Sequence, residues 1–71
     1  MSRYLIIVEE TSSGYSAYSP DIPGCVAAAS TRSEVEREMH DTIEFHIKGL
    51  RAAGEEIPQP RSEASYCEVA T

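Results

Sequence analysis

The sequence has no long apolar run and no recognisable leader. No stretch of its 71 residues approaches the ~18 consecutive apolar residues of a membrane-spanning helix. The opening residues, MSRYLIIVEE, lack the apolar core and the small-residue cleavage site of a signal peptide. These absences predict a cytoplasmic protein without a membrane segment.

Basic residues are also scarce: six of them stand against twelve acidic residues, which gives a net charge of −6. A surface with this charge repels phosphate backbones, so we expect no direct binding to nucleic acid. It would attract and steer a basic protein partner. Composition alone favours the simpler explanation, in which the charge only keeps a small protein soluble.

Residues with the spacing of a catalytic or metal site are missing too. Cys25 and Cys67 form no CxxC pair and are predicted to be small buried hydrophobes. His40 and His46 are about 120° apart around a helix and cannot share a metal ion. The glycines are isolated and form no phosphate-binding loop, and no serine has a histidine nearby in sequence. We therefore expect no metal and no cofactor.

The chain is long enough for one domain. A fold of this size buries only about 60% of the surface of its unfolded chain, so we expect support from self-association or from a partner.

A β-hairpin is predicted over residues 3–19. The β-branched run RYLIIVEE (3–10) is typical of a strand buried on both faces, and TSSG (11–14) has turn composition. YSAYS (15–19) is the second strand, in which alternation puts Tyr15 on one face and Tyr18 on the other.

A rigid corner, SPDIPGC, follows at residues 19–25. Pro20 lacks a donor for the sheet ladder, so the strand stops there or lies at an edge. Pro23 and Gly24 occupy the central positions of a type II turn, in which Gly24 needs a positive φ. Asp21 can cap neighbouring amides in an Asx-turn. We interpret Pro20, Pro23 and Gly24 as a structural corner.

The third strand is predicted over CVAAAS (25–30) and a long helix over 32–53. Thr31 and Glu34 fit a capping box at the start of this helix, and Gly54 is a natural residue after its end. An apolar stripe follows the 3.6-residue period and faces the sheet; its members are Val35, Met39, Thr42, Ile43, His46, Leu50 and Ala53.

The C-terminal residues predict a connector and a fourth strand. Pro58 and Pro60 make 55–61 extended, and 64–70 alternates as a half-buried strand. The order β-β-β-α-β predicts an α+β fold with a mixed four-stranded sheet of order 3-2-1-4 and one helix on one face. The opposite face has no helix to cover it, so we expect an interaction surface there.

This topology is also the first part of a ribonuclease-H-like fold, whose enzymes hold two magnesium ions on acidic side chains. The nearest candidates are Glu9 or Glu10, Glu44 and Glu68. The middle of the first strand carries no carboxylate, and Glu44 points away from the apolar stripe. The pattern therefore disfavours a metal-dependent nuclease.

The combination of motifs over about residues 4–60 resembles the HicB family of antitoxins. It includes the tyrosine hairpin, the D-I-P-G-C corner, a threonine that opens an acidic helix, the G-L-R-x-x-G helix end and the I-P-Q-P connector. The resemblance implies a partial ribonuclease-H-like fold without its active site, and oligomerisation as a homodimer or higher oligomer. It also implies a protein partner, the small basic mRNA-cleaving toxin HicA. Many members carry a C-terminal DNA-binding domain; here we expect a single HicB-like domain over 1–71 and no DNA-binding domain.

Two hypotheses for function follow. In the first, the chain is a non-catalytic antitoxin that occludes a basic toxin, and the candidate contact residues are Glu9, Glu10, Tyr15, Tyr18 and Asp21. Packing of the tyrosines in a homodimer is an equally good interpretation of their positions. In the second, the chain is a self-associating domain that binds a small ligand on the open sheet face, without a toxin.

Overall fold

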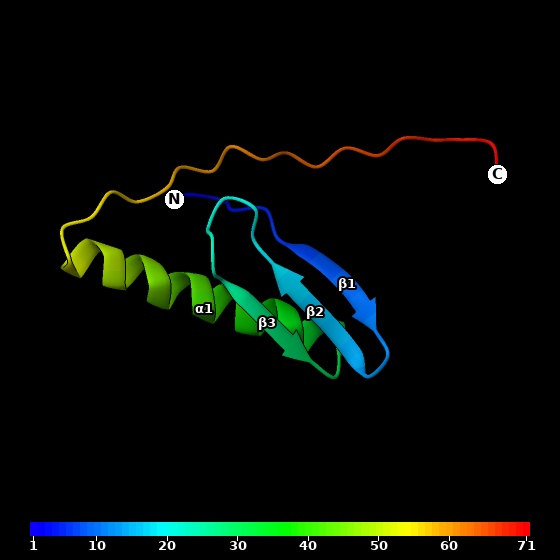
Figure 1. Cartoon of the computed structure of the whole chain (residues 1–71), viewed down its shortest axis with the longest axis horizontal. Helices are drawn as coiled ribbons and strands as arrows, with labels where there is room; N and C mark the ends of the chain where they lie inside the picture. The colour runs from blue at the N-terminus through cyan, green and yellow to red at the C-terminus, as the bar shows by residue number, and fades with distance from the viewer.

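The computed structural model describes all of residues 1–71 and has three strands and one helix. The strands are β1 (Ile7–Thr11), β2 (Gly14–Tyr18) and β3 (Val26–Ala29), and the helix is α1 (Arg32–Ala52). The sheet is antiparallel throughout, with the order β1-β2-β3. Helix α1 crosses one face of this sheet, and residues 55–71 run back past it as an extended segment (Figure 1).

The predicted hairpin forms, with Val8 opposite Ala17 and Thr11 opposite Gly14. The prediction that its first strand is buried on both faces is wrong, because the residues of β1 are half-buried or exposed. Gly14 is required because a Cβ there would collide with the carbonyl oxygen of Ala29 on β3. The hydrogen-bonded ladder begins at Ile7, which pairs with Tyr18, rather than at Arg3. Two residues after Tyr18 the chain reaches Pro20, which has no N–H to donate, so the ladder does not extend further.

Helix α1 begins at the predicted capping box. The Thr31 hydroxyl accepts a hydrogen bond from the Glu34 amide at 3.2 Å and donates one to the Glu34 carboxylate at 3.0 Å. The helix then packs mainly against β3 and β2 and less against β1. Along the helix, Glu44 and Lys48 form an i,i+4 ion pair at 4.0 Å.

The core is a single small cluster between the sheet and the helix. Its buried apolar side chains are Ala17 from β2, Ile22 and Cys25 from the corner, and Val35 and Met39 from α1. Of the 71 residues, only six are buried. The sheet–helix interface is therefore a marginal source of stability for the isolated chain.

The predicted fourth strand does not form, and the predicted mixed four-stranded sheet of order 3-2-1-4 is wrong. Residues 64–70 are extended but belong to no ladder, and Tyr66 and Val69 are 97% and 71% exposed. The structure is of the α+β class with the order β-β-β-α, so it lacks the last strand of the ribonuclease-H-like arrangement.

The composition of this segment explains why the strand is absent. Residues 64–70 offer few large apolar side chains to offset the entropy of ordering a strand, and parallel pairing to β1 would be less stable than antiparallel pairing. We name residues 63–71 the C-terminal arm. The arm makes the molecule elongated, with a radius of gyration of 13.9 Å; a compact chain of this length would have about 11 Å.

Helix α1 is the only helix of the structure, and it does not have the apolar character that crossing a membrane requires.

Candidate protein interface

The sheet has one face that the helix leaves uncovered, which we call the open face. The strand register aligns Ile7, Tyr18 and Val26 in one row across all three strands of this face. Tyr18 is 43% exposed and Val26 is 65% exposed, whereas Ala17, the next residue on β2, is buried beneath the helix. The row therefore presents Tyr18 and Val26 to solvent, with Ile7 half-buried beside them.

Acidic and small residues border this row. Glu9, Ser16 and Ala28 form the next row of the open face, with Glu9 on β1 and Ala28 on β3. The face combines an aromatic side chain, Tyr18, with a carboxylate, Glu9, at its margin. Such a surface suits contact with another macromolecule.

The structure does not bring the five predicted contact residues together. Glu9 and Tyr18 lie on the open face, whereas Glu10 and Tyr15 are opposite each other on the helix side of the sheet. Tyr15 packs against the hydrophobic core, and Asp21 lies in the corner beyond β2.

The corner is built as the sequence predicts. The Ile22 carbonyl accepts a hydrogen bond from the Cys25 amide at 3.3 Å, and Gly24 between them has a φ of 86°. This turn buries Ile22 and Cys25 against the core while the rings of Pro20 and Pro23 stay exposed. The corner thus anchors the sheet to the helix and fixes where β3 begins.

The prediction that Asp21 caps neighbouring amides in an Asx-turn is wrong, because its hydrogen bonds go to the C-terminal segment. Its carboxylate accepts hydrogen bonds from the amides of Arg61 and Ser62 at 2.9 and 2.8 Å, and from the Ser62 hydroxyl at 2.9 Å. These bonds, the Ser62 amide first, hold the pKa of Asp21 below its ordinary value of 3.8. Asp21 is therefore a clamp that ties the C-terminal segment to the corner.

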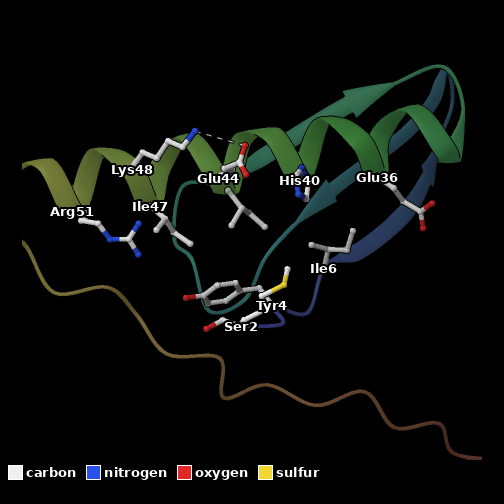
Figure 2. Close-up of a pocket in the computed structure, with 11 residues that line it drawn as sticks. Ser2, Tyr4, Ile6, Glu36, His40, Glu44, Ile47, Lys48 and Arg51 are labelled. Carbon is white, nitrogen blue, oxygen red and sulfur yellow. Dashed lines mark ion pairs between the residues drawn. The ribbon is translucent and has the colours of Figure 1, made fainter.

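A second feature is a groove of about 580 Å³ between the N-terminal segment and α1 (Figure 2). Apolar side chains line it on both sides, with Tyr4 and Ile6 opposite Ile43 and Ile47. The Tyr4 hydroxyl donates a hydrogen bond to the Pro58 carbonyl at 2.6 Å, which adds a second tie to the C-terminal segment. The polar residues of the groove are of both signs: Glu36, His40, Glu44, Lys48 and Arg51.

Of these groove residues, sequence reasoning identified Ile43 but missed Tyr4 and Ile47. Ile47 follows Ile43 by one helical turn and lies at the margin of the predicted stripe. This spacing could have identified Ile47 as a groove residue. Nothing local in the sequence pointed to Tyr4, whose partner is 54 residues away.

The residues considered for metal or nucleophilic chemistry are scattered. No three histidine, cysteine, aspartate or glutamate side chains are grouped in a way that could hold a metal ion. Glu44 pairs with Lys48, and Glu68 lies on the exposed arm. Cys25 is buried, which raises its pKa, whereas Cys67 is exposed. The prediction that both cysteines are buried is therefore wrong for Cys67.

Three comparisons with known proteins each found a match. Residues 4–69 match the family described as HicB_like antitoxin of bacterial toxin-antitoxin system. An uncharacterised 14.9 kDa protein from the rep-hol intergenic region of Haemophilus phage HP1 is 36% identical over 63 residues. That alignment covers 89% of this chain and 47% of the phage protein, so the chain spans about half the length of this relative.

The fold also matches a solved structure, the HicA3 and HicB3 toxin-antitoxin complex. The TM-score is 0.71 at 30% sequence identity, over 84% of this chain and 70% of the matched chain. Because the family match extends from Tyr4 to Val69, over nearly the whole sequence, this chain belongs to the HicB-like antitoxin family.

Proposed function

We propose that this chain is a non-catalytic antitoxin module that binds a small, basic, mRNA-cleaving toxin of the HicA type and inhibits it by occlusion. The observation that carries the proposal is the apolar row of Ile7, Tyr18 and Val26 on the open face, in which Tyr18 and Val26 are exposed, in a chain whose family is one of antitoxins. The module would act by covering the toxin's RNA-binding surface and would not itself bind nucleic acid.

The proposed interface is centred on Tyr18. A tyrosine at the centre of an apolar patch is the residue type that most often dominates the energy of a protein interface. Glu9 lies on the same face. The net charge of the chain, −6, would steer a basic toxin toward the patch. We assign direct contact to Tyr18 and Glu9.

The other candidates would act at the margin or indirectly. Glu10 and Tyr15 lie on the helix side of the sheet, Glu10 on the edge strand β1 and Tyr15 on the central strand β2, so a partner that extends over the β1 edge would reach Glu10 first. Asp21 would contribute by holding the C-terminal segment in place through its bonds to Arg61 and Ser62.

The alternative function, binding of a small ligand to the open face, has less support. Small-molecule sites are concave and surround their ligand. The groove of about 580 Å³ lies between the N-terminal segment and α1, on the helix side of the sheet and not on the open face.

The test is a calorimetric titration of the chain with any small basic protein that an adjacent gene encodes. Tyr18→Ala should raise Kd by about 30-fold or more, since truncation of such an anchor costs about 2 kcal/mol. Tyr66→Ala is the matched control, because Tyr66 is 97% exposed on the arm, and it should change Kd by less than about twofold. Complex formation with equal affinity for both variants would refute the proposed interface, and no binding to any basic neighbour would refute the function.

A further inference from the structure

The outer edge of β1 has no partner in the chain. β1 is the first strand in the order β1-β2-β3, so only one of its two edges is paired. The two-residue loop makes Thr11 and Gly14 a hydrogen-bonded pair, and such pairs alternate along an antiparallel ladder. The N–H and C=O groups of Val8 and Glu10 therefore point away from β2, and no further hydrogen bond of the structure involves them.

A second hollow, of about 390 Å³, lies along this free edge, and we call it the slot. It is lined by Leu5–Val8 and Glu10 on one part and by Ala64 and Tyr66 of the C-terminal arm on another. Consecutive residues of a strand point to alternate faces, so a hollow that touches all of Leu5–Val8 lies along the strand edge, where main-chain groups are accessible. Tyr66 is 97% exposed, so the arm borders the slot without filling it.

The C-terminal segment is tied down just before the arm begins. The Asp21 carboxylate accepts hydrogen bonds from the amides of Arg61 and Ser62, and the Tyr4 hydroxyl donates one to the Pro58 carbonyl. The arm that follows forms no hydrogen bond with β1. These ties, and not pairing with β1, hold the segment beside the sheet, so the main-chain groups of the β1 edge stay available.

The charges around the slot select the kind of segment that it takes. Glu10 and Glu36 line the slot with one cation, Arg32, which is already paired with Glu36 at 3.5 Å. The arm adds Glu63 and Glu68. Charges on an edge strand prevent pairing with a like-charged strand, so a second copy of this acidic chain is disfavoured here. A basic segment would meet opposite charges.

We propose that an extended segment of the toxin, carrying lysine or arginine, adds to the free edge of β1 as a further strand. This inference rests on the proposed function and specifies how the partner continues from the open face around the β1 edge. Main-chain hydrogen bonds to Val8 and Glu10 supply affinity. Alternate side chains of the segment supply specificity, with apolar ones over Ile6 and Val8 and basic ones beside Glu10.

Two substitutions at Glu10 separate a main-chain contact from a charge contact. Glu10→Pro removes the outward N–H and the charge, whereas the matched variant Glu10→Gln removes only the charge. Proline is tolerated on an edge strand where the missing N–H would face solvent, so both chains should fold, and circular dichroism checks this. In calorimetric titrations with the basic protein that an adjacent gene encodes, Glu10→Pro should raise Kd at least about tenfold relative to Glu10→Gln, because a main-chain hydrogen bond is lost.

Amide hydrogen exchange of the wild-type chain decides the question if Glu10→Pro does not fold. The amides of Val8 and Glu10 face solvent in the free chain, so the same basic protein should slow their exchange on the order of 100-fold. Unchanged exchange at these two amides, or equal Kd values for the two folded Glu10 variants, would overturn the strand addition. The proposed function would still stand in that case if Tyr18→Ala weakened binding, whereas no binding by the wild-type chain would overturn both proposals.

Discussion

The side chain of Ile22 is the part of the corner on which folding depends most. It has no exposed surface and contacts the core formed by Val35 and Met39 of α1. Ile22→Ala removes three carbon atoms, worth about 2.4 kcal/mol at about 0.8 kcal/mol per methylene. The cavity left behind adds to this loss, so we expect a destabilisation of about 3–4 kcal/mol.

A loss of this size is large for this chain. At about 0.05–0.15 kcal/mol per residue, 71 residues give a total stability of about 4–11 kcal/mol. The melting temperature should fall by at least about 12 °C, since each kcal/mol shifts a domain of this size by about 4–8 °C.

Thermal unfolding followed by circular dichroism measures this shift, with all variants at one protein concentration. Val69→Ala is the matched control, because Val69 is 71% exposed on the arm, and its effect should stay within about 0.5 kcal/mol. If Ile22→Ala melted within 3 °C of wild type, or no lower than Val69→Ala, the corner would not be part of the core.

Three further predictions concern the backbone, the clamp and the thiols. Gly24→Val should lower the free energy of unfolding by about 1–3 kcal/mol, because valine is strained at the φ of 86° that Gly24 adopts. A Cβ at this position would meet nothing within 4 Å, so backbone strain is the expected cause. An unchanged melting temperature would contradict the type II turn. The pKa of Asp21 is lowered in the folded state, so docking of the C-terminal segment is complete above pH 3.8 and is lost as pH falls through the lowered pKa. The amide resonance of Ser62 should therefore titrate in NMR spectra below pH 3.8, and Asp21→Asn should abolish that titration; a flat wild-type curve would contradict the clamp. A thiol reagent should label Cys67 rapidly and Cys25 only on unfolding, since burial shields the Cys25 thiol and raises its pKa; two equally fast thiols would contradict this.

Elements with local signals were predictable from the sequence. The hairpin, the corner with Gly24 and the helix from its cap at Thr31 are specified by residues within a few positions of one another. Proline geometry, a positive-φ glycine, a capping box and a 3.6-residue period act before any tertiary contact exists.

Features that depend on distant contacts were not predictable. The alternation in 64–70 is compatible with a strand, but a strand forms only if its partner contributes enough burial, and Tyr66 and Val69 remain exposed. Asp21 accepts a hydrogen bond from the amide of Ser62, which is 41 residues away in the sequence, and no local sequence pattern indicates such a contact. For the candidate site, alternation correctly placed Tyr15 and Tyr18 on opposite faces, but it could not tell which face the helix would cover.

The central claim is that the open face of the sheet, rather than the groove beside α1, contacts the toxin. Isoleucine and valine methyl NMR spectra of the chain with and without its toxin test this directly, because Ile7 and Val26 report on the open face and Ile43 and Ile47 on the groove. We predict that the methyl resonances of Ile7 and Val26 shift or broaden on binding while those of Ile43 and Ile47 stay in place. The reverse pattern would contradict the proposed interface.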